Sequence, residues 1–210
     1  MIIPNFKLSN NDQNGFTVAE FVTVLGIVSI LMAISLYNYS GFNDRAALSS
    51  ATQEISLAIR QAQSYGLNVR ETTVGSGNFS SAFGVYFHPN NDPTNYYIFV
   101  DNNPANGKYD AGAGCGTVGT ECIQSISIRN GVRVIDIDST DGCGSANSAR
   151  SLNIMFRRPN LDASLNFVNN GGNFVCNSPP RSGAKIVVRS KNGVQTEVTV
   201  QSTGQVYVVE

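Results

Sequence analysis

Apolar residues along the chain follow three patterns, and each pattern predicts a different kind of element. From Phe16 to Tyr37 almost every position is apolar, and Glu20 carries the only charge in these 22 residues. At roughly 1.5 Å of rise per residue, a helix of this length covers about 33 Å, enough for a hydrocarbon core of about 30 Å. We therefore predict that residues 16–37 form a transmembrane segment.

Beyond residue 37 the apolar positions recur at spacings of three and four, which is the period of an amphipathic helix. The positions with this spacing are Leu48, Ala51, Ile55, Ala58, Ile59 and Ala62. We predict that the helix continues over residues 38–68 and ends near Gly66 and Asn68. Gly26 and Gly41 weaken a helix relative to alanine, so they are the predicted bend sites.

After residue 69 the pattern changes to short runs of β-branched and aromatic residues with turn residues between them. Such runs occupy residues 83–87, 96–100, 123–128, 132–137 and 152–156. Near the end of the chain, Asn192-Gly193 separates two further runs and a turn near Gly204 precedes a last one, which predicts a three-stranded meander. The expected fold class is α+β: a long N-terminal helix packed on an antiparallel β-sheet head formed by residues 69–210.

The segment before the apolar run has the order of a cleavable leader. Residues 1–15 are polar and precede the apolar run directly, whereas a secretory signal peptide has a small-residue cleavage site after its apolar core. The junction reads G-FTVAE, with Gly15 and Phe16 at the boundary and Glu20 in the fifth position counted from Phe16. On this motif and its place ahead of the apolar run, the chain resembles the type IV pilin family, which includes the pseudopilins of type II secretion.

The resemblance implies that a prepilin peptidase cuts between Gly15 and Phe16 and methylates the new N-terminus, and that Glu20 serves in assembly. It implies a structural subunit, a minor pilin or pseudopilin of the GspH/FimT type, in a type II secretion pseudopilus or a type IV pilus. The expected partners are other pilin or pseudopilin subunits, the prepilin peptidase and an inner-membrane assembly platform. The expected location is the bacterial inner membrane, crossed once, with the head outside the cytoplasm, followed by a periplasmic or extracellular filament.

A carboxylate in a membrane segment needs a partner. Insertion scales put the cost of an isolated one at a helix centre at about 2.5–3.5 kcal/mol. Cleavage after Gly15 would free the amine of Phe16, which stays mostly cationic at neutral pH. We predict that Glu20 meets this amine, within one chain in the membrane or between adjacent subunits in a filament.

The composition of the chain suits an exported protein. Charged residues make up 14% of the chain against a typical value of about 25%, so the surface is expected to be polar and neutral. The net charge of −1 gives no overall attraction to nucleic acid or anionic lipid.

Four cysteines lie in polar, glycine-rich stretches: Cys115, Cys122, Cys143 and Cys176. In an oxidising compartment they allow three pairings, of which Cys115 with Cys122 and Cys143 with Cys176 closes the most local loops. Zinc is the alternative, but the chain has no C-x-x-C pair and its only histidine is His88.

Residues 101–114 resemble a degenerate calcium loop, because Asp and Asn side chains alternate around a glycine. The candidate calcium ligands are Asp101, Asn103, Asn106 and Asp110. Asp101 lies one residue too far back, and no glutamate follows at the closing position. A turn built from Gly, Asn and Pro without a metal is the other interpretation. No cofactor other than calcium is expected.

Residues 150–191 are strongly basic, with Asp162 as their only acid. Besides Arg150, the candidate contacts for DNA or another polyanion are Arg157, Arg158, Arg181, Lys185, Arg189 and Lys191. The alternative function is therefore a DNA-binding or surface-binding minor pilin of a type IV pilus, acting in DNA uptake or adhesion. Solvated charges at strand edges are the simpler interpretation. Catalysis is not expected, because His88 precedes Pro89 with no Ser or Cys nucleophile motif around it.

Overall fold

The structure is a computed structural model of the whole chain. It describes residues 15–68, 71, 77, 79–102, 104–112, 114–117, 119–142, 151–160, 162–175 and 181–209, without the side chains of residues 37–40. The chain divides into two compact units, Met1–Phe42 and Asn43–Glu210, which are described separately below. One helix, α1 (Val18–Leu67), contributes to both units and runs without interruption through the predicted bend sites Gly26 and Gly41.

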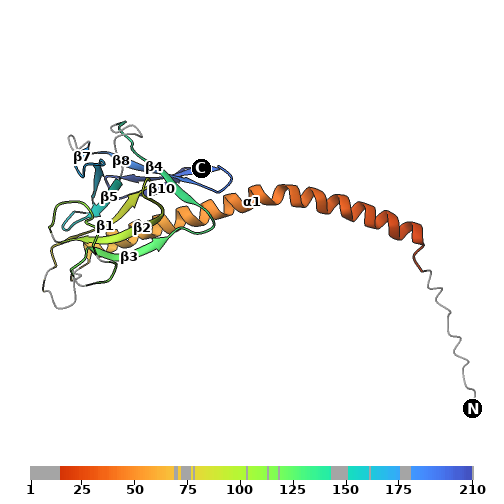
Figure 1. Cartoon of the computed structure of the whole chain (residues 1–210), viewed down its shortest axis with the longest axis horizontal. Helices are drawn as coiled ribbons and strands as arrows, with labels where there is room; N and C mark the ends of the chain where they lie inside the picture. Colours follow the sequence, from red (N-terminus) through yellow and green to blue (C-terminus); the bar gives the residue numbers. More distant parts are fainter. Residues whose placement is uncertain are drawn as a thin grey trace, which may run out of the picture. The chain divides into compact units, whose positions relative to one another are not determined.

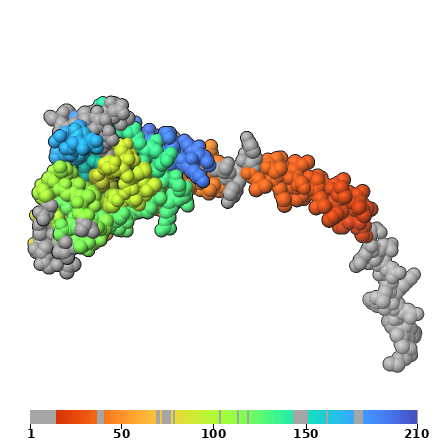
Figure 2. Space-filling view, viewed as in Figure 1, coloured from red at the N-terminus to blue at the C-terminus, as the bar shows by residue number. Residues whose placement is uncertain are grey.

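The first unit contains the apolar part of α1. Every described side chain from residue 16 to residue 36 is exposed, and the space-filling view draws this segment as a narrow rod of red and orange atoms (Figure 2). In the described part of the chain, α1 is the one helix long and apolar enough to cross a membrane. Its hydroxyl groups bond to the helix itself: Ser29 Oγ donates to the Leu25 carbonyl at 2.7 Å, and Ser35 Oγ donates to the Leu31 carbonyl at 2.9 Å. The segment therefore presents apolar surface on all sides.

The second unit, the head, contains the amphipathic part of α1. All six apolar positions predicted from the helical spacing are buried. The helix ends at Leu67, one residue before the predicted stop, and the Asn68 amide donates to the Ser64 carbonyl at 2.9 Å. At Gly66 the helix approaches strand β5 (Ser151–Phe156) so closely that a Cβ atom would lie 2.6 Å from the Phe156 carbonyl oxygen. Glycine is thus required here for packing.

Two antiparallel sheets complete the head (Figure 1). Sheet A has the order β3 (Cys122–Ser127), β2 (Asp92–Asp101), β1 (Ala82–His88), β5 (Ser151–Phe156), β6 (Ala163–Val168), β7 (Phe174–Val175). Sheet B has the order β10 (Val206–Val209), β9 (Gln195–Gln201), β8 (Gly183–Arg189), β4 (Arg133–Ser139). The predicted α+β fold class is confirmed, as is the meander of β8, β9 and β10.

One hydrophobic core joins α1 to both sheets. It includes Ile55 and Ile59 of α1, Phe87 of β1 and Ile186 of β8. A second, smaller cluster of Ala82, Phe99 and Met155 forms with Tyr86 and Tyr109. Because β5 supplies residues to both clusters, all six of its residues are buried. Both faces of sheet A are thus covered at its centre.

Candidate functional site

The predicted cleavage site lies immediately before α1. Gly15 and Phe16 have no regular secondary structure, and Phe16 is 89% exposed. A Cβ atom at Gly15 would have no neighbour within 4 Å. Residues 1–14 of the predicted leader lie outside the described residues. The bond between Gly15 and Phe16 is therefore in exposed, non-helical backbone, the form in which a peptidase can bind a chain.

Glu20 forms a capping box with Thr17 at the start of α1. Glu20 Oε2 accepts hydrogen bonds from the backbone N–H and the hydroxyl of Thr17, both at 3.0 Å. In return, the Glu20 N–H donates to Thr17 Oγ1 at 3.2 Å. These reciprocal bonds satisfy N–H groups that a helix start leaves unpaired, and the carboxylate complements the helix dipole. Both residues lie after the predicted cut, so cleavage would leave the box intact.

The two carboxylate oxygens of Glu20 differ. Oε2 takes both bonds from Thr17, whereas Oε1 has no hydrogen-bond partner within the described part of the chain. The carboxylate therefore keeps one oxygen available for a cation while the other fixes the helix start. The structure shows an intact chain, so the predicted pairing of Glu20 with the Phe16 amine stays a prediction.

Asp101, the first candidate calcium ligand, is bound by protein groups. Its side chain is 1% exposed, and its Oδ1 accepts from the backbone N–H groups of Asn106 at 2.9 Å and Gly107 at 3.3 Å. Its Oδ2 lies 3.5 Å from the guanidinium of Arg157. This carboxylate fixes the turn that follows β2.

Asn106 and Asp110 contact each other: the side-chain amide of Asn106 donates to Asp110 Oδ2 at 2.7 Å, and its carbonyl oxygen accepts from the Lys108 N–H at 3.0 Å. Asn103 lies outside the described residues. Within the residues described, no group of three or more His, Cys, Asp or Glu side chains is placed to hold a metal. Calcium binding stays a prediction, and the described bonds favour a turn held by hydrogen bonds.

Glu121, which the sequence analysis did not single out, organises the same loop. It is 2% exposed, and its carboxylate accepts from the backbone N–H of Asp110 at 2.7 Å and of Asn102 at 3.3 Å. The loop between β2 and β3 is therefore fastened at both ends by buried carboxylates.

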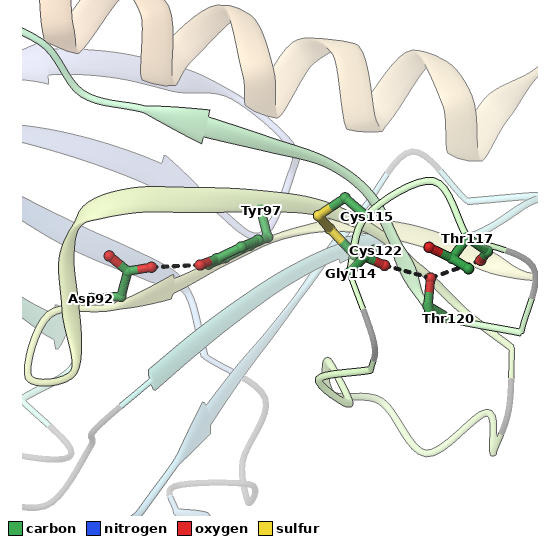
Figure 3. Close-up of a disulfide and its surroundings, with 7 residues drawn as sticks. All are labelled: Asp92, Tyr97, Gly114, Cys115, Thr117, Thr120 and Cys122. Atoms are coloured by element: carbon green, nitrogen blue, oxygen red, sulfur yellow. Dashed lines mark hydrogen bonds between the residues drawn. A yellow bond between two sulfur atoms is a disulfide. The ribbon is translucent and has the colours of Figure 1, made fainter.

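A disulfide joins Cys115 to Cys122, as predicted, and closes the end of this loop next to β3 (Figure 3). Beside the bridge, the Thr120 hydroxyl donates to the carbonyl groups of Gly114 at 2.9 Å and Thr117 at 2.8 Å. Cys143 and Cys176 lie outside the described residues, so their pairing stays a prediction. A disulfide is typical of an oxidising compartment.

The six candidate polyanion contacts do not form one group. Lys185 pairs with Glu197 at 3.6 Å, and Arg157 pairs with Asp101. Arg158 donates to the backbone carbonyl of Phe79. Hydrogen bonds from Ser182, together with the charge of Arg181, hold the pKa of Asp141 below its usual value. With its amide in the orientation that satisfies both groups, Gln195 accepts from Nε of Arg189 at 2.9 Å, so five of the six have partners of their own.

Two of the candidates, Arg189 and Lys191, belong to a cluster at one end of sheet B. Arg133 of β4 lies directly opposite Arg189 of β8, and Lys191 lies 3.4 Å from a Cβ built on Gly131. Arg129 is in the same turn. We call Arg129, Arg133, Arg189 and Lys191 the basic end of sheet B. No acidic side chain among the described residues forms an ion pair with them. Arg129 and Arg133 were missed because they are separated in sequence from the other two.

His88 lies at the margin of an aromatic cluster. Its Nδ1 accepts from the Asn91 N–H at 3.1 Å, and its ring packs edge-on against Tyr86 with centroids 6.0 Å apart. Tyr97 stacks on Tyr109 in the same cluster with centroids 5.5 Å apart. The Asp92 carboxylate accepts the Tyr97 hydroxyl at 2.5 Å and raises the pKa of this phenol to about 12. Each of these polar contacts is structural.

We compared the chain with known proteins, and it matches no family model, no curated protein and no solved structure.

Proposed function

We propose that this chain is a structural subunit of a filament, a minor pilin or pseudopilin of a type II secretion pseudopilus or a type IV pilus. It assembles through α1 after cleavage between Gly15 and Phe16. One observation carries the proposal: a helix with apolar surface on all sides starts directly after an exposed Gly-Phe bond, and its first turn bears a carboxylate with a free oxygen.

The exposed apolar surface needs a non-aqueous environment. A helix that is apolar all round is stable inside a membrane or inside a bundle of helices. The internal bonds of Ser29 and Ser35 remove the need for water in either place. The membrane holds the subunit before assembly, and neighbouring copies of α1 cover the same surface afterwards.

Cleavage supplies a positive charge that can pair with the carboxylate of Glu20. It creates an ammonium group at Phe16, one helical turn before Glu20, and the free Oε1 accepts from the amine of an adjacent copy. Because an unpaired charge in an apolar bundle is costly, this pair selects the axial register in which both charges are satisfied. The disulfide of the head, and the one helix among the described residues that is long and apolar enough to span a membrane, fit a bacterial inner-membrane protein whose head lies outside the cytoplasm.

Mass spectrometry of the N-terminus tests the proposal. The full chain is expressed in a bacterium with a prepilin peptidase and in the same strain without it. The expected mature chain starts at Phe16 and carries one methyl group, and the strain without the peptidase retains Met1. An intact Met1 in both strains, or a start at another residue, would contradict the proposal.

The basic end of sheet B supports a second candidate function, binding of DNA or another polyanion by the head. Arg133 and Arg189 are direct cross-strand neighbours, and like charges in this position cost stability unless an anion bridges them. Nearby, Lys191 and Arg129 are exposed. The arrangement thus favours a ligand with repeated negative charges over a single carboxylate.

The test is retardation of a short DNA duplex by the full chain in detergent at several salt concentrations. Arg133→Gln with Arg189→Gln is expected to weaken binding and to lower the salt slope by about one per lost phosphate contact. Arg157→Gln with Lys185→Gln is the matched control, because these two cations already pair with carboxylates. Equal effects of the two double variants, or no retardation, would exclude this site.

A further inference from the structure

The edge strands of the two sheets differ in how well they are protected from pairing with a strand of another molecule. In the described part of the chain the edges are β3 and β7 of sheet A, and β4 and β10 of sheet B. A free edge pairs with another strand unless charge, a bulge or shortness prevents it. β7 has only two residues, and β4 carries Arg133, Asp136 and Asp138 beside a register shift. By contrast, β3 and β10 contain no charged side chain.

β10 is apolar on both of its faces. Val206 and Val208 lie opposite Val200 and Val198 of β9, which are fully buried, so they extend the core face of sheet B. The other face carries Tyr207 and Val209. Exposure is 44% for Tyr207, 39% for Val208 and 44% for Val209. A strand that exposes both its backbone edge and its apolar side chains has the properties of one half of an interface.

The free edge of β3 borders a groove in the same unit. The groove has a volume of about 470 Å³ and lies between β3 and the head half of α1. Residues from both elements line it, including Leu57 and Ala58 of α1 and Ser125 and Ile126 of β3. Leu57 is 63% exposed. A strand added to the edge of β3 would therefore cover apolar side chains of α1 on one face.

We infer that β10 of one copy of this chain pairs with the free edge of β3 in a second copy. The two faces match. Ile126 and Gln124 lie on the core face of sheet A, opposite Tyr96 and Ile98, whereas Ser125 lies opposite Tyr97 on the other face.

The bonds from the Ile128 N–H to the Thr94 carbonyl and from the Gln201 N–H to the Gln205 carbonyl show which backbone groups point to the free edges: those of Ser125 on β3, and those of Val206 and Val208 on β10. The two strands therefore pair in parallel, with Val206 opposite Gln124, Tyr207 opposite Ser125, and Val208 opposite Ile126. Both valines then point toward the helix side of the groove, where Leu57 and Ala58 lie, and Tyr207 lies beside Tyr97. A shift by one residue would place the valines on the opposite face, so the apolar pattern fixes the register.

This contact joins two different surfaces, so each copy has one donor strand and one acceptor edge. Such a contact repeats from copy to copy and, unless the rotation between copies closes a ring, generates an open chain of heads, whereas pairing of β10 with itself would stop at a dimer. The inference rests on the proposed assembly function and deepens it, because it names a contact between heads in addition to the packing of α1.

Cysteine cross-linking of the full chain in detergent tests the contact. Tyr207→Cys and Ser125→Cys proteins are mixed under mild oxidation, and the expected product is a disulfide-linked dimer that requires both variants. Thr203→Cys is the matched control for Tyr207→Cys, because Thr203 is exposed in the turn before β10. Linkage no stronger than in this control would overturn the inference. Equal linkage of Tyr207→Cys with itself would overturn it in favour of a two-fold dimer.

A second variant tests the contact while its thermal midpoint shows whether the head is still folded. Val208→Lys places a charge on the edge and is expected to reduce the cross-link by about tenfold, equivalent to about 1.4 kcal/mol. The thermal midpoint of the head should stay close to that of Thr203→Lys. An unchanged cross-link would contradict the inference. Filaments that form without the cross-link would contradict the head contact alone, whereas an uncut N-terminus would contradict the proposed function.

Discussion

The two halves of α1 have the same backbone and opposite surfaces. From residue 16 to residue 36 every described side chain is exposed, although nearly all of them are apolar. From residue 43 to residue 67 most apolar side chains form one buried stripe, and charged side chains such as Arg45 and Arg60 are exposed. The head half is therefore held by packing within its own chain, whereas the apolar half depends on what surrounds it.

This difference separates two sources of stability. Substitutions in the head half act on the folding of a single chain. Under the proposed function, substitutions in the apolar half of α1, residues 16–36, which we call the membrane half, act on insertion and on contacts between copies. Matched substitutions in the two halves test whether this division holds.

The largest effect is expected from removal of a buried side chain. Ile59→Ala should lower the free energy of unfolding of the head by about 2–5 kcal/mol, because Ile59 is fully buried in the main core. Ile30→Ala is the control in the membrane half, where Ile30 is 62% exposed, and should leave the head unchanged. Urea unfolding of the full chain in detergent, followed by near-ultraviolet circular dichroism, measures both. Equal losses would break the comparison.

Addition of one methyl group should give the next largest effect. Gly66→Ala places a Cβ atom 2.6 Å from the Phe156 carbonyl oxygen, so α1 and β5 must separate, at a cost of about 1–3 kcal/mol. At Gly26 the added atom has no neighbour within 4 Å, and Gly26→Ala should not lower the unfolding free energy. The same urea titration detects the difference. A tolerated Gly66→Ala would show that the close approach is not required.

Glu20 and Thr17 separate helix capping from pairing between subunits. Thr17→Ala removes one half of the capping box and should cost about 0.5–2 kcal/mol at the helix start. Glu20→Ala also removes the free Oε1. It should insert into the membrane normally but enter filaments about tenfold less, equivalent to about 1.4 kcal/mol. Counting subunits in sheared filaments tests this, and equal losses for the two variants would assign Glu20 to capping alone.

The smallest effect is expected on the stability of the head at alkaline pH. The hydrogen bond to Asp92 raises the pKa of Tyr97 to about 12, above the ordinary phenol value of about 10. The folded head holds this proton more tightly than the unfolded chain, so its contribution to stability is complete below pH of about 10 and is lost as the pH rises toward 12. Asp92→Asn should flatten this loss in thermal unfolding scans. An unchanged pH dependence would show that the bond is not responsible.

The regular elements of the head were largely predictable from the sequence. Both halves of α1 and the runs at 83–87, 96–100 and 152–156 lie within observed elements, because tertiary packing agrees with their local apolar patterns. The strand β6 was missed although Ala163, Leu165 and Phe167 alternate with polar residues. The two residues of β7 carry no pattern of their own and depend on pairing with β6.

The sites were less predictable, because they depend on contacts between distant residues. Nothing local to Glu121 shows that its carboxylate binds the amides of Asn102 and Asp110. Arg129 and Arg133 join Arg189 only through the pairing of β4 with β8. The capping box was visible as T-x-x-E, but the resemblance to pilins directed attention to a charge partner outside the helix.

The bonds of Ser29 and Ser35 to their own helix have a consequence for the energetics of the proposed polymerisation. A subunit that leaves the bilayer for a growing polymer exchanges acyl chains for side chains of its neighbours, and neither hydroxyl has to break a bond to lipid, water or protein. The exchange then changes mainly van der Waals contacts, which are similar on both sides. The free energy of transfer from the bilayer to the filament is then close to zero. The charges at the helix start and the contacts between heads therefore decide whether the subunit enters the filament.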